Sequence, residues 1–278
     1  MNYKLIAIDL DGTLLTDDKK VPEENKKVLV DAIHKGYEVV IATGRRYWSA
    51  KRFVKEIDEN LTILANNGNI ARNIKDDKVL IKKYLDKDDF YTLIKEGKKK
   101  ELYPIIHVDN YEEGYDMVIE LDKDNEKYCN YLSGNIDRYK RIEDLTKIDT
   151  PKVLSVVYVG DKNVMEKFNL YITRAYPGKY SSHVMYNLKI AEALLELMNP
   201  NGTKWLSLEE YAEEKGIISS EIITIGDDSN DIEMLTKAGL GIAMKNSSDF
   251  VKKTADVVTE KDNNNCGVAY TLRKILNL

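Results

Sequence analysis

The segment Leu5–Leu15 reads LIAIDLDGTLL. Its first four residues are aliphatic, which predicts a strand buried on both faces, as in a parallel sheet. Asp9 and Asp11 follow this strand, and Gly12 permits a tight turn after them. Open α/β sheets bind ligands beyond the carboxyl ends of their strands, so both carboxylates fall where chemistry is expected. Taken alone, Asp-x-Asp-Gly is also the composition of an ordinary polar turn.

Composition and charge restrict the class of protein. The chain has 278 residues, enough for one large domain or two moderate ones, and 43% of them are hydrophobic, so a buried core can form. The formal net charge of −5 argues against nucleic acid as the main partner, because proteins that bind it usually carry a basic face. The 2 cysteines are too few for a disulfide framework.

Hydropathy along the chain predicts a cytoplasmic protein. No segment reaches the run of about 18 apolar residues that a membrane span needs. The first strand begins almost directly after Met1, which leaves no room for a signal peptide. We therefore expect a reducing, cytoplasmic setting, no membrane association and no obligatory protein partner.

Strands and helices alternate in the first third of the chain. After the first strand, a helix is expected from Pro22 to about Lys35, because Pro is favoured at an early helical position and the apolar residues follow helical spacing. Apolar strands are expected at 37–42 and 61–65, with a helix between them. This alternation predicts an α/β fold with a Rossmann-like, doubly wound parallel sheet.

The middle of the chain departs from this alternation. From 84 to 189, short β-like runs and helical segments follow one another irregularly, which predicts an inserted α+β domain with its own sheet. Alternation returns with the apolar run Leu194–Met198, whose length fits a helix or a strand, and continues with a helix from Thr203. We therefore predict a core domain of residues 1–83 plus 190–278 and an inserted cap of residues 84–189, since insertion at a loop is well tolerated.

The two aspartates after the first strand suit phosphoryl transfer. Side chains alternate along an extended chain, so Asp9 and Asp11 point to the same side. Two close carboxylates resist ionisation unless a cation lies nearby, and Mg²⁺ would relieve this repulsion. Asp9 could then attack a phosphoryl group, and Asp11 could protonate the leaving oxygen and later deprotonate water.

Two further residues suit an anion, although each has an ordinary structural explanation. Thr43 ends the second strand and opens a helix, so its hydroxyl and the nearby N–H groups could bind a phosphoryl oxygen or could simply cap the helix. Lys204 begins a helix, where its charge opposes the helix dipole, and a bound phosphoryl group would compensate. A solvated surface lysine is the alternative.

An acidic loop follows the strand at 221–225. Carboxylates such as Asp227 and Asp231 are suited to completing a metal site. One or two acids here could instead cap the next helix, but three are more than a cap requires.

Taken together, these motifs resemble the haloacid dehalogenase-like hydrolase superfamily. Its signature Asp-x-Asp-Gly-Thr-Leu is matched at Asp9–Leu14, its Thr-Gly-Arg at Thr43–Arg45, its lysine at Lys204 and its Gly-Asp-x-x-Asn-Asp at Gly226–Asp231. The inserted segment between the threonine and lysine motifs is similar to the cap of Cof-type phosphatases. Thr203 stands where that group usually has serine.

The resemblance implies a role for each matched position. Asp9 would be the nucleophile and a metal ligand, and Asp11 the general acid and base, with its backbone carbonyl on Mg²⁺. The phosphoryl group would be bound by Thr43, Gly44, Lys204 and Asn230. Asp227 would be a metal ligand, and Asp231 would either bind the metal or support the residues that bind it. The resemblance implies no role for Asp228 and no firm role for Arg45 or Asn67.

The expected function is a Mg²⁺-dependent phosphatase that hydrolyses a small phosphorylated metabolite, such as a sugar phosphate or a phosphorylated cofactor, through an aspartyl-phosphate. A phosphomutase would use the same fold and pass the phosphoryl group to a second hydroxyl. A regulatory receiver also carries a phosphorylated aspartate and Mg²⁺, but it is typically one small domain without a cap of roughly 100 residues. A catalytically silent binding protein is the remaining alternative.

Overall fold

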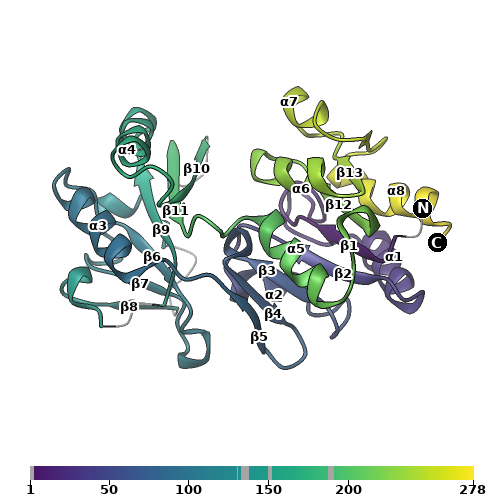
Figure 1. Ribbon diagram of the computed structural model, residues 1–278, viewed down its shortest axis with the longest axis horizontal. Coiled ribbons are helices and arrows are strands. Elements are labelled where there is room, and N and C mark those ends of the chain that lie inside the picture. The colour runs from purple at the N-terminus through teal and green to yellow at the C-terminus, as the bar shows by residue number, and fades with distance from the viewer. Residues whose placement is uncertain (1–2, 130, 133–137, 150–151, 187–190) are drawn as a thin grey trace. The chain divides into compact units, whose positions relative to one another are not determined.

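The computed structural model describes residues 3–129, 131–132, 138–149, 152–186 and 191–278 (Figure 1). The chain divides into two compact units, Met1–Lys82 with Thr203–Leu278, and Lys83–Gly202. We call them the core unit and the inserted unit. None of the helices in these described ranges has the length and apolar character that crossing a membrane would require.

The core unit contains an 8-stranded sheet in the order β14-β13-β12-β1-β2-β3-β4-β5. Its strands are β1 (Leu5–Ile8), β2 (Glu38–Ala42), β3 (Thr62–Ala65), β4 (Ile70–Asn73), β5 (Val79–Lys82), β12 (Ile222–Gly226), β13 (Leu240–Ala243) and β14 (Val257–Val258). Pairing is parallel from β14 through β3, and β4 and β5 extend the sheet in antiparallel fashion. β1 lies between β2 and β12, so the first strand and a strand from the distant C-terminal part are neighbours.

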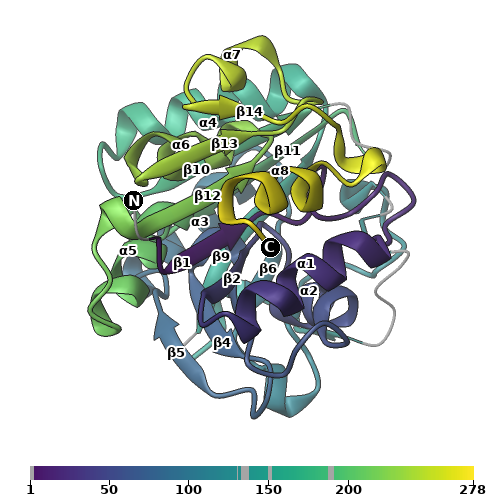
Figure 2. The same ribbon diagram turned by 90° about the vertical axis from the view of Figure 1, so that its right-hand side faces the viewer.

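Helices lie on both faces of this sheet. They are α1 (Glu23–His34), α2 (Tyr47–Val54), α5 (Lys204–Glu214), α6 (Ile232–Lys237), α7 (Asp249–Lys252) and α8 (Gly267–Leu276). On one face, Trp205 and Leu208 of α5 belong to the same buried cluster as Leu5 of β1. α1 and α8 lie side by side (Figure 2), and the buried Asn25 of α1 accepts a hydrogen bond from the N–H of Ala269 in α8. The predicted doubly wound α/β fold is confirmed.

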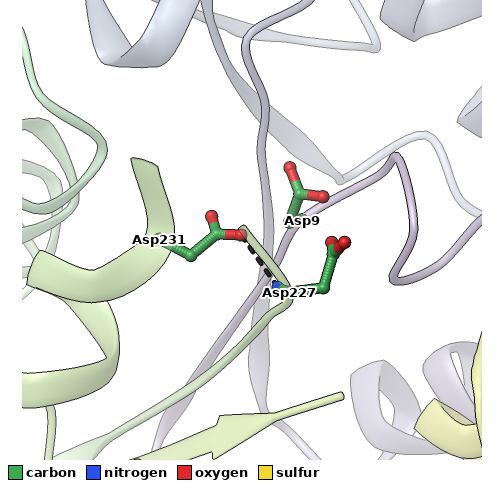
Figure 3. Close-up of side chains that lie close together, drawn as sticks. All are labelled: Asp9, Asp227 and Asp231. Atoms are coloured by element: carbon green, nitrogen blue, oxygen red, sulfur yellow. Dashed lines mark hydrogen bonds between the residues drawn. The ribbon is translucent and has the colours of Figure 1, made fainter. Parts of the chain in front are cut away.

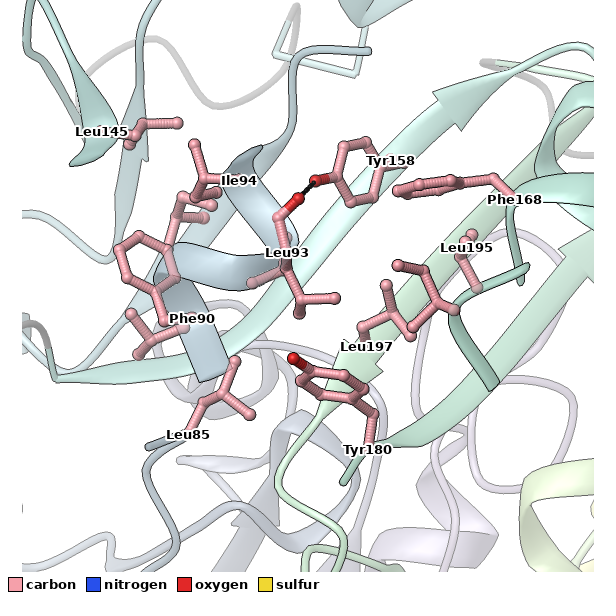
Figure 4. Packing of buried hydrophobic residues seen from close by; sticks show 14 of the residues in the cluster. Leu85, Phe90, Leu93, Ile94, Leu145, Tyr158, Phe168, Tyr180, Leu195 and Leu197 are labelled. Carbon is pink, nitrogen blue, oxygen red and sulfur yellow. Dashed lines mark hydrogen bonds between the residues drawn. The ribbon is translucent and has the colours of Figure 1, made fainter. Parts of the chain in front are cut away.

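The inserted unit is an α+β domain. Its 6-stranded sheet has the order β10-β11-β9-β6-β7-β8, antiparallel except for the pair β7 and β8. The strands are β6 (Ile105–Val108), β7 (Met117–Ile119), β8 (Tyr139–Arg141), β9 (Val153–Gly160), β10 (Ser181–Tyr186) and β11 (Ala193–Met198), and the helices are α3 (Lys87–Lys98) and α4 (Lys162–Ala175). Figure 4 shows the core between helices and sheet, where the Tyr158 hydroxyl donates to the carbonyl of Leu93 at 2.9 Å.

Short 3₁₀ helices complete the chain. They are η1 (Asn66–Gly68), η2 (Tyr111–Glu113), η3 (Glu126–Tyr128), η4 (Leu145–Lys147), η5 (Ser219–Glu221), η6 (Ser229–Asp231) and η7 (Asn263–Asn265). η1 follows β3 and η6 follows β12, so both lie after strands of the core sheet.

The run Leu194–Met198 belongs to the inserted unit, whereas the sequence pattern predicts it in the core domain. It forms β11, which pairs antiparallel with β9 and β10 inside the inserted unit. The division between the units therefore falls at Gly202–Thr203, and the predicted limit between 189 and 190 touches residues outside the described ranges. The sequence of a single apolar run does not indicate which strands it pairs with. The pattern could therefore not distinguish the last strand of the inserted unit from the first core strand after the insertion.

Candidate active site

The acidic residues after β1 and β12 converge because these strands are parallel neighbours. Ile8 is paired with Ile225, and the N–H of Asp9 continues the ladder to the carbonyl of Ile225 at 3.0 Å. Asp227 follows β12, and Asp231 follows one turn later. One carboxylate oxygen from each of Asp9, Asp227 and Asp231 lies within 4.8 Å of the others (Figure 3). Segments 218 positions apart in sequence thus form one cluster of carboxylates.

Two glycines allow the carboxylates to approach the backbone closely. A Cβ on Gly12, whose φ is +77°, would lie 2.2 Å from Oδ2 of Asp227. A Cβ on Gly226 would lie 2.5 Å from Cγ of Asp231. No real side chain tolerates either separation, so glycine is required for this arrangement. The Thr13 hydroxyl donates to Oδ1 of Asp227 at 2.8 Å and fixes its orientation.

Lys204 is a buried cation in this cluster. Its Nζ lies 2.7 Å from Oδ1 of Asp9 and 2.7 Å from Oδ1 of Asp231, and the residue is only 2% exposed. Burial alone would lower the pKa of Lys204, but the two carboxylates hold it above its usual value. Thr203 caps α5 by accepting from the N–H of Leu206 at 3.1 Å, so the helix begins where the lysine must be placed.

The cluster carries more negative than positive charge. With all three carboxylates ionised, the charge of the one ammonium would leave an excess of two negative charges. Burial raises the pKa of Asp9 well above its usual value, and the neighbouring carboxylates raise it further against the opposing effect of Lys204. Burial and the charge of Asp231 raise the pKa of Asp227 to about 7. A divalent cation would remove this repulsion, and oxygen donors are the ligands that Mg²⁺ prefers.

Asp231 differs from the other two carboxylates in that both its oxygens already accept hydrogen bonds. Oδ1 accepts from Lys204, and Oδ2 accepts from the N–H groups of Asp227 and Asp228 at 2.9 and 3.1 Å. These contacts shape the loop that presents Asp227. Asp228 is exposed and caps η6, accepting from the N–H of Ser229 at 2.6 Å.

Asp11 lies apart from this cluster and is held by two cations. Arg45 binds it through Nε and Nη2 at 2.5 and 2.7 Å, and Nζ of Lys19 lies 2.6 Å from Oδ1. Burial alone would raise the pKa of Asp11, but Arg45 and Lys19 lower it below its usual value. Sequence reasoning left Arg45 without a firm role and missed Lys19, which belongs to no motif and has no signal except its charge near Asp11.

Thr43 is buried at the end of β2 and does not cap a helix. Its hydroxyl accepts from the N–H of Arg45 at 3.1 Å, whereas α2 begins at Tyr47 with Arg46 as its N-cap. The alternative explanation of Thr43 as a helix cap is therefore wrong. The next residue, Gly44, lies close to Asn67, since an added Cβ would meet Oδ1 of that amide at 3.3 Å.

Asn230 contacts Asn67, the residue of the turn after β3 for which the sequence implies no firm role. Its Nδ2 donates to Oδ1 of Asn67 at 3.0 Å. Thus Thr43, Gly44, Asn67 and Asn230 lie around one turn, next to the segment that starts with Lys204. All eight residues that the sequence singled out lie at the carboxyl ends of core strands or at the start of α5.

Comparison with known proteins points to one family. The family model described as haloacid dehalogenase-like hydrolase matches residues 6–272. Two similar proteins are named 5-amino-6-(5-phospho-D-ribitylamino)uracil phosphatase. YcsE of Bacillus subtilis is 26% identical, and the match covers 98% of this chain and 96% of YcsE. YbjI of Escherichia coli is 25% identical, and the match covers 99% of this chain and 97% of YbjI. A crystal structure of a haloacid dehalogenase-like hydrolase from Bacteroides thetaiotaomicron has a TM-score of 0.82 at 27% identity and covers 99% of this chain and 100% of that one. The chain belongs to the haloacid dehalogenase-like hydrolase family.

Proposed function

We propose that this hydrolase is a Mg²⁺-dependent phosphatase that cleaves a small phosphomonoester through an aspartyl-phosphate on Asp9. The observation that carries the proposal is the group of Asp9, Asp227 and Lys204, in which two close carboxylates, suited to nucleophilic attack and to a cation, lie beside a buried ammonium. The names of YcsE and YbjI, which specify a phosphorylated ribitylamino compound, support a substrate in which the phosphate is carried by a sugar or sugar alcohol.

The donor set fits Mg²⁺. Asp9 and Asp227 offer carboxylate oxygens at the ends of adjacent strands, and the backbone carbonyl of Asp11 would complete the protein's contribution. Asp231 would support this set by orienting Asp227 and pairing with Lys204. When bound, the cation would neutralise the excess negative charge and attract a phosphoryl oxygen.

In the first step, an oxygen of Asp9 attacks phosphorus, and the bond from phosphorus to the ester oxygen breaks. Asp11 donates a proton to that oxygen, and the alcohol leaves. Arg45 and Lys19 both favour the ionised form of Asp11. To carry this proton, Asp11 must therefore leave its ion pairs with these two cations and contact the leaving oxygen.

In the second step, water attacks phosphorus and breaks its bond to Asp9. Asp11 accepts the proton from this water, and orthophosphate is released. The ion pairs of Asp11 with Arg45 and Lys19 favour the ionised carboxylate that this step needs.

Lys204 would bind the phosphoryl group with its remaining N–H. An ammonium has three N–H bonds, and two of those of Lys204 point to Asp9 and Asp231. The Thr43 hydroxyl, the backbone at Gly44 and the amide of Asn230 would supply further donors. Fixed donors of this kind stabilise charge on the equatorial oxygens during transfer.

A phosphate-release assay over a panel of phosphorylated sugars, sugar alcohols and cofactors tests the proposal. We expect Mg²⁺-dependent release from at least one compound by the wild type and none by Asp9→Asn. No release from any compound would refute the proposed phosphatase. An obligatory bisphosphorylated intermediate would instead identify a mutase, and a phospho-Asp9 that persists for minutes would identify a regulatory protein.

A further inference from the structure

The turn after β3 has an unusual backbone. Asn66, Asn67 and Gly68 have φ values of +49°, +55° and +92°, so three consecutive residues are left-handed. Asn66 and Asn67 are almost completely buried. Left-handed backbone is rare for residues other than glycine, and a run of it persists only where surrounding contacts require it.

Backbone contacts attach this turn to the loop that carries Thr43. The N–H of Asn67 donates to the carbonyl of Thr43 at 2.9 Å, and the N–H of Asn66 donates to the carbonyl of Arg45 at 2.9 Å. Both N–H groups therefore face the loop that follows β2. The position of the Thr43–Gly44 backbone is therefore coupled to the conformation of the Asn67 turn.

The same turn contacts the segment that carries Lys204. The Ser207 hydroxyl donates to the carbonyl of Gly68 at 2.7 Å, and a Cβ on Gly68 would lie 2.5 Å from the carbonyl oxygen of Thr203. The turn is thus packed directly against the start of α5.

The side chain of Asn67 makes the third connection. Its Oδ1 accepts from Nδ2 of Asn230 at 3.0 Å and lies next to Gly44. Glycine at position 67 would adopt the same backbone with less strain, but it would provide no acceptor. Asparagine combines tolerance of left-handed φ with a short amide, which explains why this residue type suits the position.

We propose that Asn67 is a positioning residue of the phosphoryl-binding site, which holds the Asn230 amide and the Thr43–Gly44 backbone at a fixed separation from each other. The inference rests on the proposed phosphatase function and adds a residue to it. Asn67 acts through Asn230, since it holds one N–H of the Asn230 amide, and an amide has a second N–H and an oxygen for further contacts.

Asn67→Gly tests the inference, because it keeps the backbone conformation and removes only the amide. With p-nitrophenyl phosphate and Mg²⁺, we expect kcat/KM to fall about tenfold, as for the loss of one oriented hydrogen bond. The inhibition constant of orthophosphate should rise in parallel. A loss of folded protein alone would lower kcat and leave this inhibition constant unchanged.

A double-mutant cycle with Asn230→Ala identifies the route of the effect. If Asn67 acts through Asn230, the double variant should be no worse than Asn230→Ala, within about twofold. Losses that multiply would contradict this route and overturn the inference.

Asn69→Ala is the matched control. Asn69 is a buried asparagine of the same turn, and its Nδ2 donates to the carbonyl of Asn66 at 2.7 Å. We expect a lower melting temperature with kcat/KM within about twofold of the wild type. An equal loss in Asn69→Ala and Asn67→Gly would mean that the integrity of the turn, and not the Asn67 amide, is what matters.

The outcomes separate this inference from the proposed function. A wild type that hydrolyses no phosphomonoester removes the proposed function and the inference with it. An active wild type with Asn67→Gly unchanged in kcat/KM and in orthophosphate inhibition removes the inference alone.

Discussion

Replacing Asp227 by asparagine should make the metal-free protein more stable while abolishing its activity. The pKa of this carboxyl is raised from 3.8 to about 7, first by burial and then by the charge of Asp231. A difference of one in pKa corresponds to about 1.36 kcal/mol, so ionising Asp227 in the folded protein costs about 4 kcal/mol more than in the unfolded chain. This cost already includes the favourable effects of the Thr13 hydroxyl and the Lys204 charge on the ionised carboxylate. An amide does not reproduce every contact of the protonated carboxyl that it replaces, and we therefore expect a net gain of about 2 kcal/mol at pH 8.

The sign of the pH dependence follows from the same shift. Between about pH 4 and 7, the folded protein keeps a proton that the unfolded chain has lost, so the stability of the metal-free wild type falls as the pH rises through this window. Asparagine at position 227 cannot ionise, and the variant should lack this decline. Below about pH 4, Asp227 is protonated in both the folded and the unfolded wild type, and the difference between variant and wild type should be small.

Urea unfolding at pH 4 and pH 8, in EDTA and in Mg²⁺, measures these differences. The matched control is Asp228→Asn, the same chemical change at the adjacent exposed position, where asparagine remains a good cap for η6 and the change should stay within about 0.5 kcal/mol. Mg²⁺ should stabilise the wild type and Asp228→Asn far more than Asp227→Asn. If Asp227→Asn is less stable than the wild type at pH 8 in EDTA, or is stabilised equally by Mg²⁺, the electrostatic reasoning is wrong.

Three further outcomes are expected. Asp9→Asn should release no phosphate while its circular dichroism spectrum matches the wild type, and a wild-type turnover rate would exclude Asp9 as the nucleophile. Gly12→Ala should weaken Mg²⁺ activation at least about tenfold, because the new Cβ would lie only 2.2 Å from Oδ2 of Asp227 and would push this carboxylate aside. An unchanged dependence of the rate on Mg²⁺ concentration would count against Asp227 as a ligand at this position. Lys204→Met should lower the free energy of unfolding by about 3–5 kcal/mol at neutral pH, as measured with urea in EDTA, since it leaves buried carboxylates without their cation; a change below about 1 kcal/mol would show that the pairing matters little.

Much of the core could be predicted because local signals agreed with the global fold. The aliphatic run Leu5–Ile8 is fully buried, as its composition indicated, and parallel strands place Asp9 and Asp227 at one edge of the sheet. The helix expected from Pro22 to Lys35 is observed at Glu23–His34. These predictions needed only hydropathy, spacing and the direction of a parallel sheet.

Other features depended on contacts between distant segments. β11 has an apolar pattern that suits several places in an α/β chain, and only its pairing with β9 and β10 assigns it to the inserted unit. Lys19 contacts Asp11 because the chain turns back within eight residues, and the spacing of residues in the sequence does not predict this turn. The left-handed run at Asn66–Gly68 is compatible with its composition, but its contacts with the loop after β2 and with α5 are tertiary.

Phosphorylation of Asp9 should occur beside a cation held by Asp9 and Asp227. A crystal structure of the enzyme with Mg²⁺ and beryllium fluoride, a mimic of an acyl phosphate, would show both features at once. We expect beryllium on a carboxylate oxygen of Asp9 and one Mg²⁺ at about 2.1 Å from oxygens of both Asp9 and Asp227. Beryllium fluoride on another residue, or Mg²⁺ bound away from this pair, would exclude Asp9 as the phosphorylated residue or the pair as the cation site.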